Sequence, residues 1–209
     1  MKVDQDLWNA IVAGDRPTVE RIVSELVAAG VDAVDLLNST MIPALQEIGN
    51  RFSTGEVFIP EMLVGAQAMQ AGMDILEPLL VASGQQPIAK VCIGTVKGDL
   101  HDIGKNLVIM MLKGEGFDVE DLGVNCEIDR YAEAVERGAK VVCLSALLST
   151  TRHQMRPVIE HFADRPDIKV VVGGAAITPS YAAEIGADEY GVDAGDAVRA
   201  VRASLGLTV

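Results

Sequence analysis

The sequence has 209 residues, of which 49% are hydrophobic and 22% charged, and its 17 basic and 30 acidic residues give a net charge of -13. These values indicate a soluble globular protein with one large domain or two small ones. The acidity argues against nucleic acid as a partner, because a negative surface repels phosphates and the sequence has no visible basic patch. No apolar run reaches the length of about 18 residues that a membrane-spanning helix needs, so we expect no membrane partner.

The N-terminal sequence, Met-Lys-Val-Asp-Gln-Asp, lacks the basic and apolar regions of a signal peptide, and we therefore expect a cytoplasmic protein. The three cysteines, Cys92, Cys126 and Cys143, show no C-x-x-C spacing, and two of them lie in apolar, strand-like runs. We interpret them as buried thiols and not as a disulfide framework or a zinc site.

Apolar residues recur at helical spacing from Asp4 to about Ser83, and this pattern predicts a bundle of four helices. Helix breakers and capping residues separate the runs, among them Gly14, Pro17 and the loop at residues 53–56. Each helix alone would be marginal in water, so the four are expected to pack together. The expected helices span residues 4–13, 17–30, 32–51 and 59–82.

A different pattern follows the linker at residues 83–87: short β-branched runs alternate with amphipathic stretches. It predicts a flavodoxin- or Rossmann-like α/β domain with five parallel strands, which bind ligands at their carboxyl ends. The chain should thus divide into a helical domain, 1–86, and an α/β domain, 87–209. The expected strands are Lys90–Val96, Asp118–Leu122, Lys140–Leu144, Lys169–Val172 and Asp188–Tyr190, and the expected helices span residues 103–114, 128–137, 153–163, 179–185 and 195–204.

The segment GTVKGDLHDIGKN, at residues 94–106, connects the first strand to the next helix and places Asp99 beside His101 in a loop. It contains neither a phosphate-binding P-loop nor a G-x-G-x-x-G sequence, so it does not favour nucleotide binding. A neutral imidazole is a good ligand for a transition metal, and a carboxylate on its other ring nitrogen fixes the tautomer. The ordinary alternative is a solvated loop histidine.

Asp99, His101 and Gly104 form a D-x-H-x-x-G pattern, and the whole segment resembles the cobalamin-binding domains of methionine synthase and of the corrinoid proteins of methyltransferase systems. The resemblance implies a cobalamin or related corrinoid cofactor. It further implies that His101 is the lower axial ligand of cobalt, that Asp99 orients it, and that Gly104 opens a channel for the displaced nucleotide tail. The remaining residues assigned to this cofactor-binding loop are Gly98, Leu100, Asp102 and Ile103.

The loop after the third strand resembles the S-x-L segment of the same family, with Ser145 and Leu147 at the matching positions. By resemblance, Ser145 would bind the buried tail and Ser149 would contact the corrin ring. Where methionine synthase has a serine that completes a ligand–acid–hydroxyl relay, this chain has Thr151, and the third member of the relay stays open. A serine-rich turn is also common for structural reasons alone.

After the fourth strand, Gly173 and Gly174 match the glycine pair of the family, where side chains would block the nucleotide tail. Ala194, just before the last expected helix, is also assigned to the cofactor-binding residues. A strand that ends in glycines is common in proteins without cofactors, so this pair supports the resemblance only in combination with the other two loops.

The segment at residues 51–63 resembles the sequence that opens the last helix of the family's four-helix cap. By resemblance, Phe52, Ile59 and Met62 would cover the reactive face of the corrinoid. Met69 and Met73 recur at helical spacing with Met62 and are assigned to the core of the bundle. An apolar lid would exclude water and oxidants, and it would have to move to admit a methyl donor.

The resemblance extends from about residue 5 to 205 and implies a separate methyl carrier of one-carbon metabolism, without a complete active site of its own. Such a protein accepts a methyl group on cobalt from a substrate:corrinoid methyltransferase and passes it to a corrinoid:folate or corrinoid:thiol methyltransferase. A reductive activase would be a further partner. The methyl donor stays open among methylamines, methanol, betaine and aryl methyl ethers.

Three alternatives were weighed against this interpretation. A cobalamin-dependent regulator would need a DNA-binding domain, for which the chain has no basic recognition helix. A small subunit of an adenosylcobalamin mutase would share D-x-H-x-x-G, but the G-E-V-F-I-P segment at residues 55–60 is not expected there. A flavodoxin-like FMN or signalling domain would need a phosphate-binding loop or an acidic receiver pocket at the first strand, and the sequence has neither there.

Overall fold

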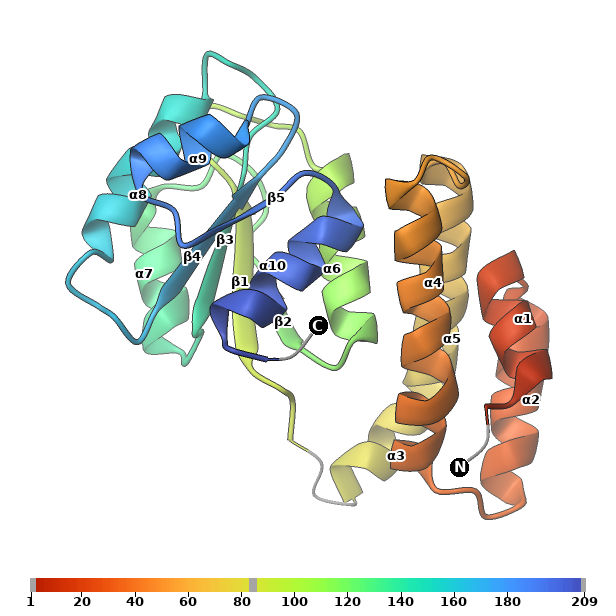
Figure 1. Ribbon diagram of the computed structural model, residues 1–209. Coiled ribbons are helices and arrows are strands. Elements are labelled where there is room, and N and C mark those ends of the chain that lie inside the picture. The colour runs from red at the N-terminus through yellow and green to blue at the C-terminus, as the bar shows by residue number, and fades with distance from the viewer. Residues whose placement is uncertain (1–2, 83–85, 208–209) are drawn as a thin grey trace. The chain divides into compact units, whose positions relative to one another are not determined.

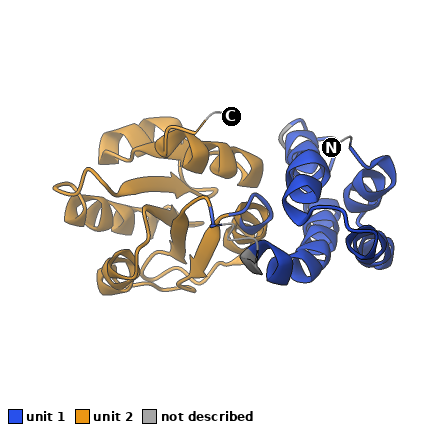
Figure 2. Ribbon diagram, turned by 90° about the horizontal axis from the view of Figure 1, so that it is seen from below, with its two compact units in different colours: residues 1–87, 113–116 blue, residues 88–112, 117–209 orange. Residues whose placement is uncertain are grey.

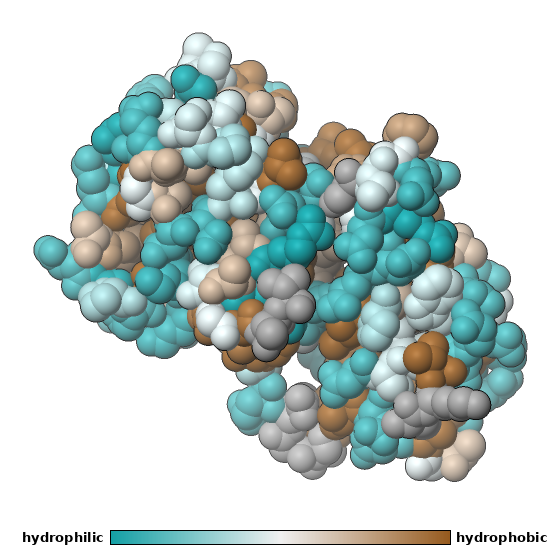
Figure 3. All heavy atoms as spheres, in the orientation of Figure 1, coloured by the Kyte–Doolittle hydropathy of each residue, from teal (hydrophilic) through white to brown (hydrophobic). Residues whose placement is uncertain are grey.

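A computed structural model describes residues 3–82 and 86–207, so that most of the expected linker at 83–87 lies outside the described residues. The chain forms two compact units, residues 1–87 with 113–116 and residues 88–112 with 117–209 (Figure 2). Hydrophilic residues cover most of the visible surface in both, with hydrophobic residues scattered between them (Figure 3). Within the described ranges, no helix is long and apolar enough to cross a membrane.

The first two helices begin and end where the sequence supplies capping groups. Helix α1 (Gln5–Ala13) begins after Asp4, whose carboxylate accepts a hydrogen bond from the amide of Leu7, and ends at Gly14 in a left-handed conformation. Helix α2 (Arg16–Ala28) is capped by Asp15 and ends two residues before the expected end at Gly30.

The third helical segment is continuous but not uniformly α-helical. It consists of α3 (Ala33–Leu36), a π-helical turn η1 (Leu37–Met41) and α4 (Ile42–Ser53), where the sequence predicts one helix over 32–51. Pro43 accounts for the difference, because it has no N–H group to donate to the preceding turn. The buried hydroxyl of Thr40, in the π turn, accepts a 3.0 Å hydrogen bond from the amide of Asp4.

The fourth segment, α5 (Ile59–Ala82), packs against α1, α2 and α4, which confirms the expected four-helix arrangement (Figure 1). Gly72 of α5 allows a close approach, since a Cβ atom there would lie 2.6 Å from the terminal methyl group of Met41. The largest completely buried side chains of this unit are Leu7, Ile11, Leu36, Met41, Leu45, Ile48, Met62, Met69 and Leu76.

The second unit is a five-stranded parallel sheet in the order β2-β1-β3-β4-β5, which confirms the expected α/β fold (Figure 1). Helices α6 and α10 cover one face of the sheet, and α7, α8 and α9 cover the other. Each strand end differs by at most one residue from its expected position. The strands are β1 (Lys90–Thr95), β2 (Asp118–Asp121), β3 (Val141–Ser145), β4 (Lys169–Gly173) and β5 (Glu189–Gly191), and the helices are α6 (Ile103–Gly114), α7 (Ile128–Glu136), α8 (Met155–His161), α9 (Pro179–Ile185) and α10 (Ala194–Ser204).

The strand order reverses between β1 and β3, because the chain first adds β2 on one side of β1 and then continues on the other side. In open parallel sheets, such a switch point leaves a crevice at the carboxyl ends of the two central strands, where ligands bind. The loop after β1 and the loop after β3 both begin at this point.

Candidate functional site

The loop after β1 turns at Gly98, whose φ of 79° lies in the left-handed region. The turn places Asp99 inside the protein, where its side chain has no exposed surface. Oδ1 of Asp99 lies 2.7 Å from Nδ1 of His101 and accepts a second hydrogen bond, of 3.1 Å, from the amide of His101. The carboxylate thus holds both the ring and the backbone of the histidine.

The other carboxylate oxygen belongs to the loop after β3. Oδ2 of Asp99 accepts hydrogen bonds from the amides of Leu147 (2.9 Å) and Leu148 (3.3 Å) and from the hydroxyl of Thr151 (2.7 Å). The relay position that the sequence left open is therefore filled by a threonine hydroxyl in contact with the acid. The two backbone amides were missed by sequence reasoning, because every residue except proline carries the same donor.

The electrostatics of Asp99 determine the tautomer of His101. Burial raises the pKa of Asp99, but hydrogen bonds from His101, Thr151 and the amides of His101 and Leu147 outweigh burial and hold that pKa well below its usual value. An ionised carboxylate can only accept hydrogen bonds, so Nδ1 of His101 donates in this contact, and in the neutral ring Nε2 is the nitrogen that has the lone pair. Since 50% of the His101 side chain is exposed, the imidazole is accessible as a metal ligand.

The part of the chain that the structure describes contains no group of three or more His, Cys, Asp or Glu residues that could hold a metal ion. A single imidazole does not suffice to retain a free transition-metal ion, which in proteins has several protein ligands. One accessible imidazole is a donor that fits a metal whose other coordination positions are filled by an organic ring.

Small residues line the carboxyl end of the sheet on the face covered by α6 and α10. Four residues pair in register across neighbouring strands: Thr95, Ser145, Gly173 and Gly191. Because successive residues of a strand face opposite sides of the sheet, these four lie on the side away from the core that packs against α7 to α9. The buried hydroxyl of Thr95 donates a 2.8 Å hydrogen bond to the carbonyl of His101. This row adds little side-chain volume beside the histidine loop.

Two glycines, Gly191 in this row and Gly174 beside it, are required because an added side chain would overlap nearby backbone atoms. Gly174 has a φ of 115°, and a Cβ atom there would overlap the carbonyl oxygen of Ala146. A Cβ atom at Gly191 would lie 2.6 Å from the Cα atom of Ala197 in α10. By contrast, a Cβ atom at Gly104 would meet nothing within 4 Å, so this position leaves open space beside the first turn of α6. Ala194, at the start of α10, is buried.

The remaining residues expected in these loops are exposed. Leu100 and Ile103 each expose 71% of their surface, and Leu147 and Leu148 are exposed as well. Together with the half-exposed imidazole, these apolar side chains provide a surface suited to a flat, largely apolar ligand. The exposed positions also include Asp102, Gly104 and Ser149.

In the helical unit, the residues expected to cover the cofactor differ in exposure. Ile59 is exposed and Phe52 is half-buried, but Met62 is completely buried and offers no surface to a ligand in this structure. These three residues were assigned by resemblance to the family's cap sequence, which does not specify how exposed each side chain is. Phe58 and Leu63, which the sequence reasoning passed over, are the exposed apolar neighbours of Ile59.

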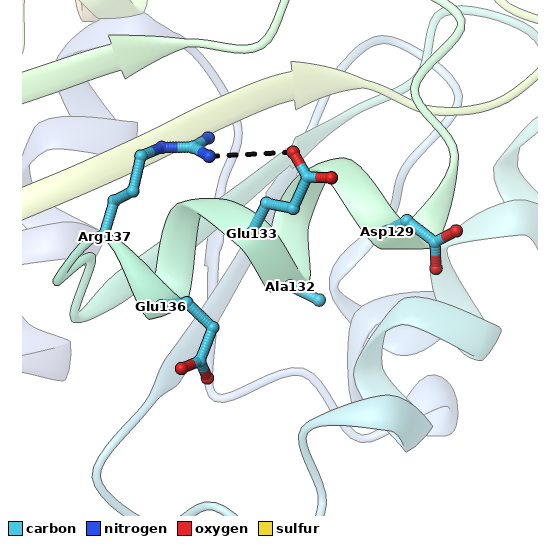
Figure 4. Close-up of a pocket in the computed structure, with 5 residues that line it drawn as sticks. All are labelled: Asp129, Ala132, Glu133, Glu136 and Arg137. Carbon is cyan, nitrogen blue, oxygen red and sulfur yellow. Dashed lines mark ion pairs between the residues drawn. The ribbon is translucent and has the colours of Figure 1, made fainter.

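A shallow hollow elsewhere on the α/β unit does not belong to this site. Its lining residues come only from α7 and its C-terminal neighbour Arg137, which lies 3.6 Å from Glu133 (Figure 4). None of the loops at the carboxyl end of the sheet contributes to it. Its lining residues are Asp129, Ala132, Glu133, Glu136 and Arg137.

Comparison with known proteins places both units in one family. Residues 89–202 and residues 3–77 match two family models, each described as a B12 binding domain. The chain belongs to the B12-binding protein family. The resemblance to corrinoid proteins of methyltransferase systems and the expected cobalamin or corrinoid cofactor are thereby confirmed.

Relatives of this B12-binding protein match over nearly its whole length. It is 38% identical to the trimethylamine corrinoid protein of Methanosarcina barkeri, over 94% of this chain and 93% of the relative. It is 36% identical to the dimethylamine corrinoid protein of the same organism, over 93% of each chain. A corrinoid protein of Desulfitobacterium hafniense is 35% identical over 99% of each chain.

Solved structures agree with the fold of this B12-binding protein. A cobalamin-binding protein from Desulfitobacterium hafniense superimposes with a TM-score of 0.80 at 28% identity, covering 95% of this chain and 96% of the other. A chain in the methanol:cobalamin methyltransferase complex MtaBC from Methanosarcina barkeri gives a TM-score of 0.81 at 25% identity, covering 98% and 80%.

Proposed function

We propose that this protein carries a methyl group on the cobalt of a bound corrinoid, between a methyltransferase that delivers the group and a second one that removes it. The observation that carries the proposal is the imidazole of His101, whose Nδ1 is held by a buried carboxylate while the ring is half exposed. The names of relatives that match over nearly the whole chain, the trimethylamine and dimethylamine corrinoid proteins, support it.

Three residues would have separate roles at this imidazole, beside that of the cofactor. The bound corrinoid supplies the chemistry, because its cobalt accepts and releases the methyl group. His101 would hold the cobalt through Nε2, while Asp99 fixes the tautomer through Nδ1 and Thr151 fixes Asp99.

The other candidate residues have supporting roles in this proposal. Ser145 and Gly173 would border the space for the nucleotide tail on the face of the sheet covered by α6 and α10, and Gly104 would keep its entrance open. In the helical unit, Ile59 and Phe52 would cover the reactive face of the corrinoid and exclude water. The division into a cap at residues 1–86 and a cofactor domain at 87–209 is part of the same proposal.

The proposed partners are a substrate:corrinoid methyltransferase, a corrinoid:folate or corrinoid:thiol methyltransferase, and a reductive activase. The similarity to a chain in a methanol:cobalamin methyltransferase complex supports docking to the first of these. Methylated amines and methanol are the donors to assay first, since these compounds occur in the names of similar proteins. A cytoplasmic location stays a prediction.

The axial-ligand assignment is tested with protein reconstituted with methylcobalamin. His101→Ala should change the visible absorption spectrum of the methylated protein, because the lower ligand is lost. His161→Ala, which replaces an exposed histidine at the end of α8, serves as the matched control and should leave the spectrum like that of the wild type. If the spectrum of His101→Ala were the same as that of the wild type, the assignment would be wrong.

The carrier role is tested by mixing the reduced holoprotein with candidate methyltransferases. One methyltransferase and its methylated substrate should convert the spectrum to that of the methylated protein, and a folate or thiol methyltransferase should reverse the change. A protein that binds corrinoid but is not methylated by enzymes for amines, methanol, betaine or aryl methyl ethers would contradict the proposal.

A further inference from the structure

The loop after β2 continues alongside the loop after β1, beyond the point where the strands end. Strand β2 ends at Asp121, yet the amide of Thr95 donates to the carbonyl of Gly123 at 3.0 Å, and the amide of Cys126 donates to the carbonyl of Thr95 at 2.9 Å. These backbone bonds hold residues 122–126 next to the segment that carries the axial histidine.

Asn125 makes the next two contacts, and both reach the residues that precede the histidine. Its Oδ1 accepts a 2.7 Å hydrogen bond from the amide of Gly98, and its own amide donates a 3.0 Å hydrogen bond to the carbonyl of Asp99. The side chain and the backbone of one residue therefore hold the two peptide groups that flank the Gly98–Asp99 peptide bond of the histidine loop.

The backbone of Asn125 is unusual. Its φ of 52° makes it the one non-glycine residue with a positive φ in the described parts of the chain. A left-handed conformation costs about 1 kcal/mol for a residue with a Cβ atom, and asparagine tolerates it better than most. Glycine would adopt this backbone more easily, but it could not accept the hydrogen bond from Gly98. The side-chain oxygen therefore distinguishes asparagine from glycine at this position.

A second link joins the end of β2 to the other side of the histidine segment. The ammonium group of Lys105, whose side chain is only 1% exposed, lies 2.6 Å from Oδ1 of Asp121. The same oxygen accepts a 2.8 Å hydrogen bond from the amide of Gly123. Residues 98–105 are therefore attached to the loop after β2 before the histidine, through Asn125, and after it, through Lys105.

We propose that Asn125 is a positioning residue for the axial ligand. By holding the N–H group of Gly98 and the carbonyl group of Asp99, it keeps the Asp99 carboxylate within hydrogen-bonding distance of Nδ1 of His101. The inference rests on the proposed role of His101 as the ligand of cobalt. Asn125 itself contacts neither the imidazole nor, by this proposal, the cofactor. Its effect is on how completely His101 is bound to the metal.

The variants separate the side chain of Asn125 from its backbone conformation. Asn125→Gly keeps the left-handed backbone and removes the acceptor, and Asn125→Ser is a second variant with a shortened side chain. Asn125→Asp keeps an oxygen near the position of Oδ1. Glu127→Gln is the matched control, because the exposed ion pair of Glu127 with Lys97, at 2.9 Å, joins the same two loops but leaves Gly98 untouched.

Two readouts are independent of methyl transfer. In the cofactor-free protein, hydrogen exchange of the Gly98 amide should be faster in Asn125→Gly than in Asn125→Asp or Glu127→Gln. In holoprotein labelled with ¹⁵N-histidine and reduced to Co(II), electron paramagnetic resonance distinguishes a bound protein nitrogen from the corrinoid's own base. The ratio of His101-bound to unbound cobalt should fall about threefold to tenfold in Asn125→Gly and Asn125→Ser, the loss expected for one neutral hydrogen bond.

The ratio in Asn125→Asp and Glu127→Gln should stay within about twofold of the wild type, since an exposed ion pair contributes little. A wild-type ratio in Asn125→Gly and Asn125→Ser, with the histidine signal absent in His101→Ala, would overturn the positioning role alone. A histidine signal that persisted in His101→Ala would instead refute the ligand assignment, so the two failures are distinguishable.

Discussion

The hydroxyl of Thr151 donates a 2.7 Å hydrogen bond to Oδ2 of Asp99, a residue 52 positions earlier in the chain. The carbonyl of Leu148 lies 3.0 Å from the same hydroxyl, which has only one proton to share between the two acceptors. The charged acceptor is the closer and the stronger one. The carboxylate of Asp99 therefore joins the loop after β3 to the imidazole of His101.

Replacing Thr151 by valine should lower the free energy of unfolding by about 2 kcal/mol, because the buried carboxylate loses a charge-assisted hydrogen bond. Thr151→Ser keeps the hydroxyl and should retain most of that free energy. Urea unfolding of the cofactor-free variants measures both changes. Equal stabilities of the valine and serine variants would show that the hydroxyl contributes nothing.

The stability of the cofactor-free protein should depend on pH through Asp99. Its pKa is lowered in the folded state, so its stabilising contribution is present above the unfolded-state value of about 3.9 and is lost as the pH falls below it. The variant Asp99→Asn lacks this titration. The difference in unfolding free energy between the wild type and Asp99→Asn, measured in urea from pH 6 down to pH 3, should shrink as the pH falls. A difference that does not vary with pH would contradict the lowered pKa.

Substitution of Gly174 by alanine should destabilise the protein by more than about 3 kcal/mol, since the new Cβ atom would overlap the carbonyl oxygen of Ala146 in addition to the strained φ. Gly138→Ala is the matched control, because Gly138 has a similar φ of 101° with nothing within 4 Å of the added atom. It should cost about 1 kcal/mol, from backbone strain alone. Urea unfolding compares the two, and equal losses would show that the contact with Ala146 is relieved by local movement.

The ion pair of Lys105 and Asp121 should respond asymmetrically to mutation. The Lys105 side chain is 1% exposed and that of Asp121 is 46% exposed, so water can hydrate the carboxylate but not the ammonium. Asp121→Ala leaves the buried ammonium without its carboxylate, although the side-chain oxygen of Asn106 still accepts a 2.8 Å hydrogen bond from it. This variant should cost about 2 kcal/mol more than Lys105→Met, which removes the charge. Urea unfolding of both variants measures the difference. A larger loss for Lys105→Met would mean that the ammonium group has another essential contact.

The sequence was sufficient to predict the sheet because its three central strands, β1, β3 and β4, are buried on both faces and read as short β-branched runs between helical stretches. It missed the π turn η1, since one proline inside a helical pattern does not reveal whether the chain breaks, kinks or adds a residue to the turn. Met62 was assigned to the lid by resemblance to the family's cap sequence, and a sequence match does not specify that its side chain is completely buried in this structure.

The site was predicted less completely than the fold. Asp99 and His101 are two residues apart, so their pairing was readable from the local pattern, whereas the bond from Thr151 depends on the lengths of two loops. Asn125 was missed, although an asparagine two residues after a glycine, in a loop that follows a strand, is one of the few signals of a left-handed residue. Its partner, the amide of Gly98, has no signature in sequence.

The convergence of two distant loops on Asp99 has a consequence for the order of events during synthesis. A growing chain that has released residues only as far as 144 already contains Asp99 and His101, but it lacks the amides of Leu147 and Leu148 and the hydroxyl of Thr151. Until β3 has paired with β1, the buried position of the carboxylate does not exist. The hydrogen bonds that fix the Asp99 carboxylate, and through it the imidazole of His101, therefore form only after the third strand has left the ribosome and docked.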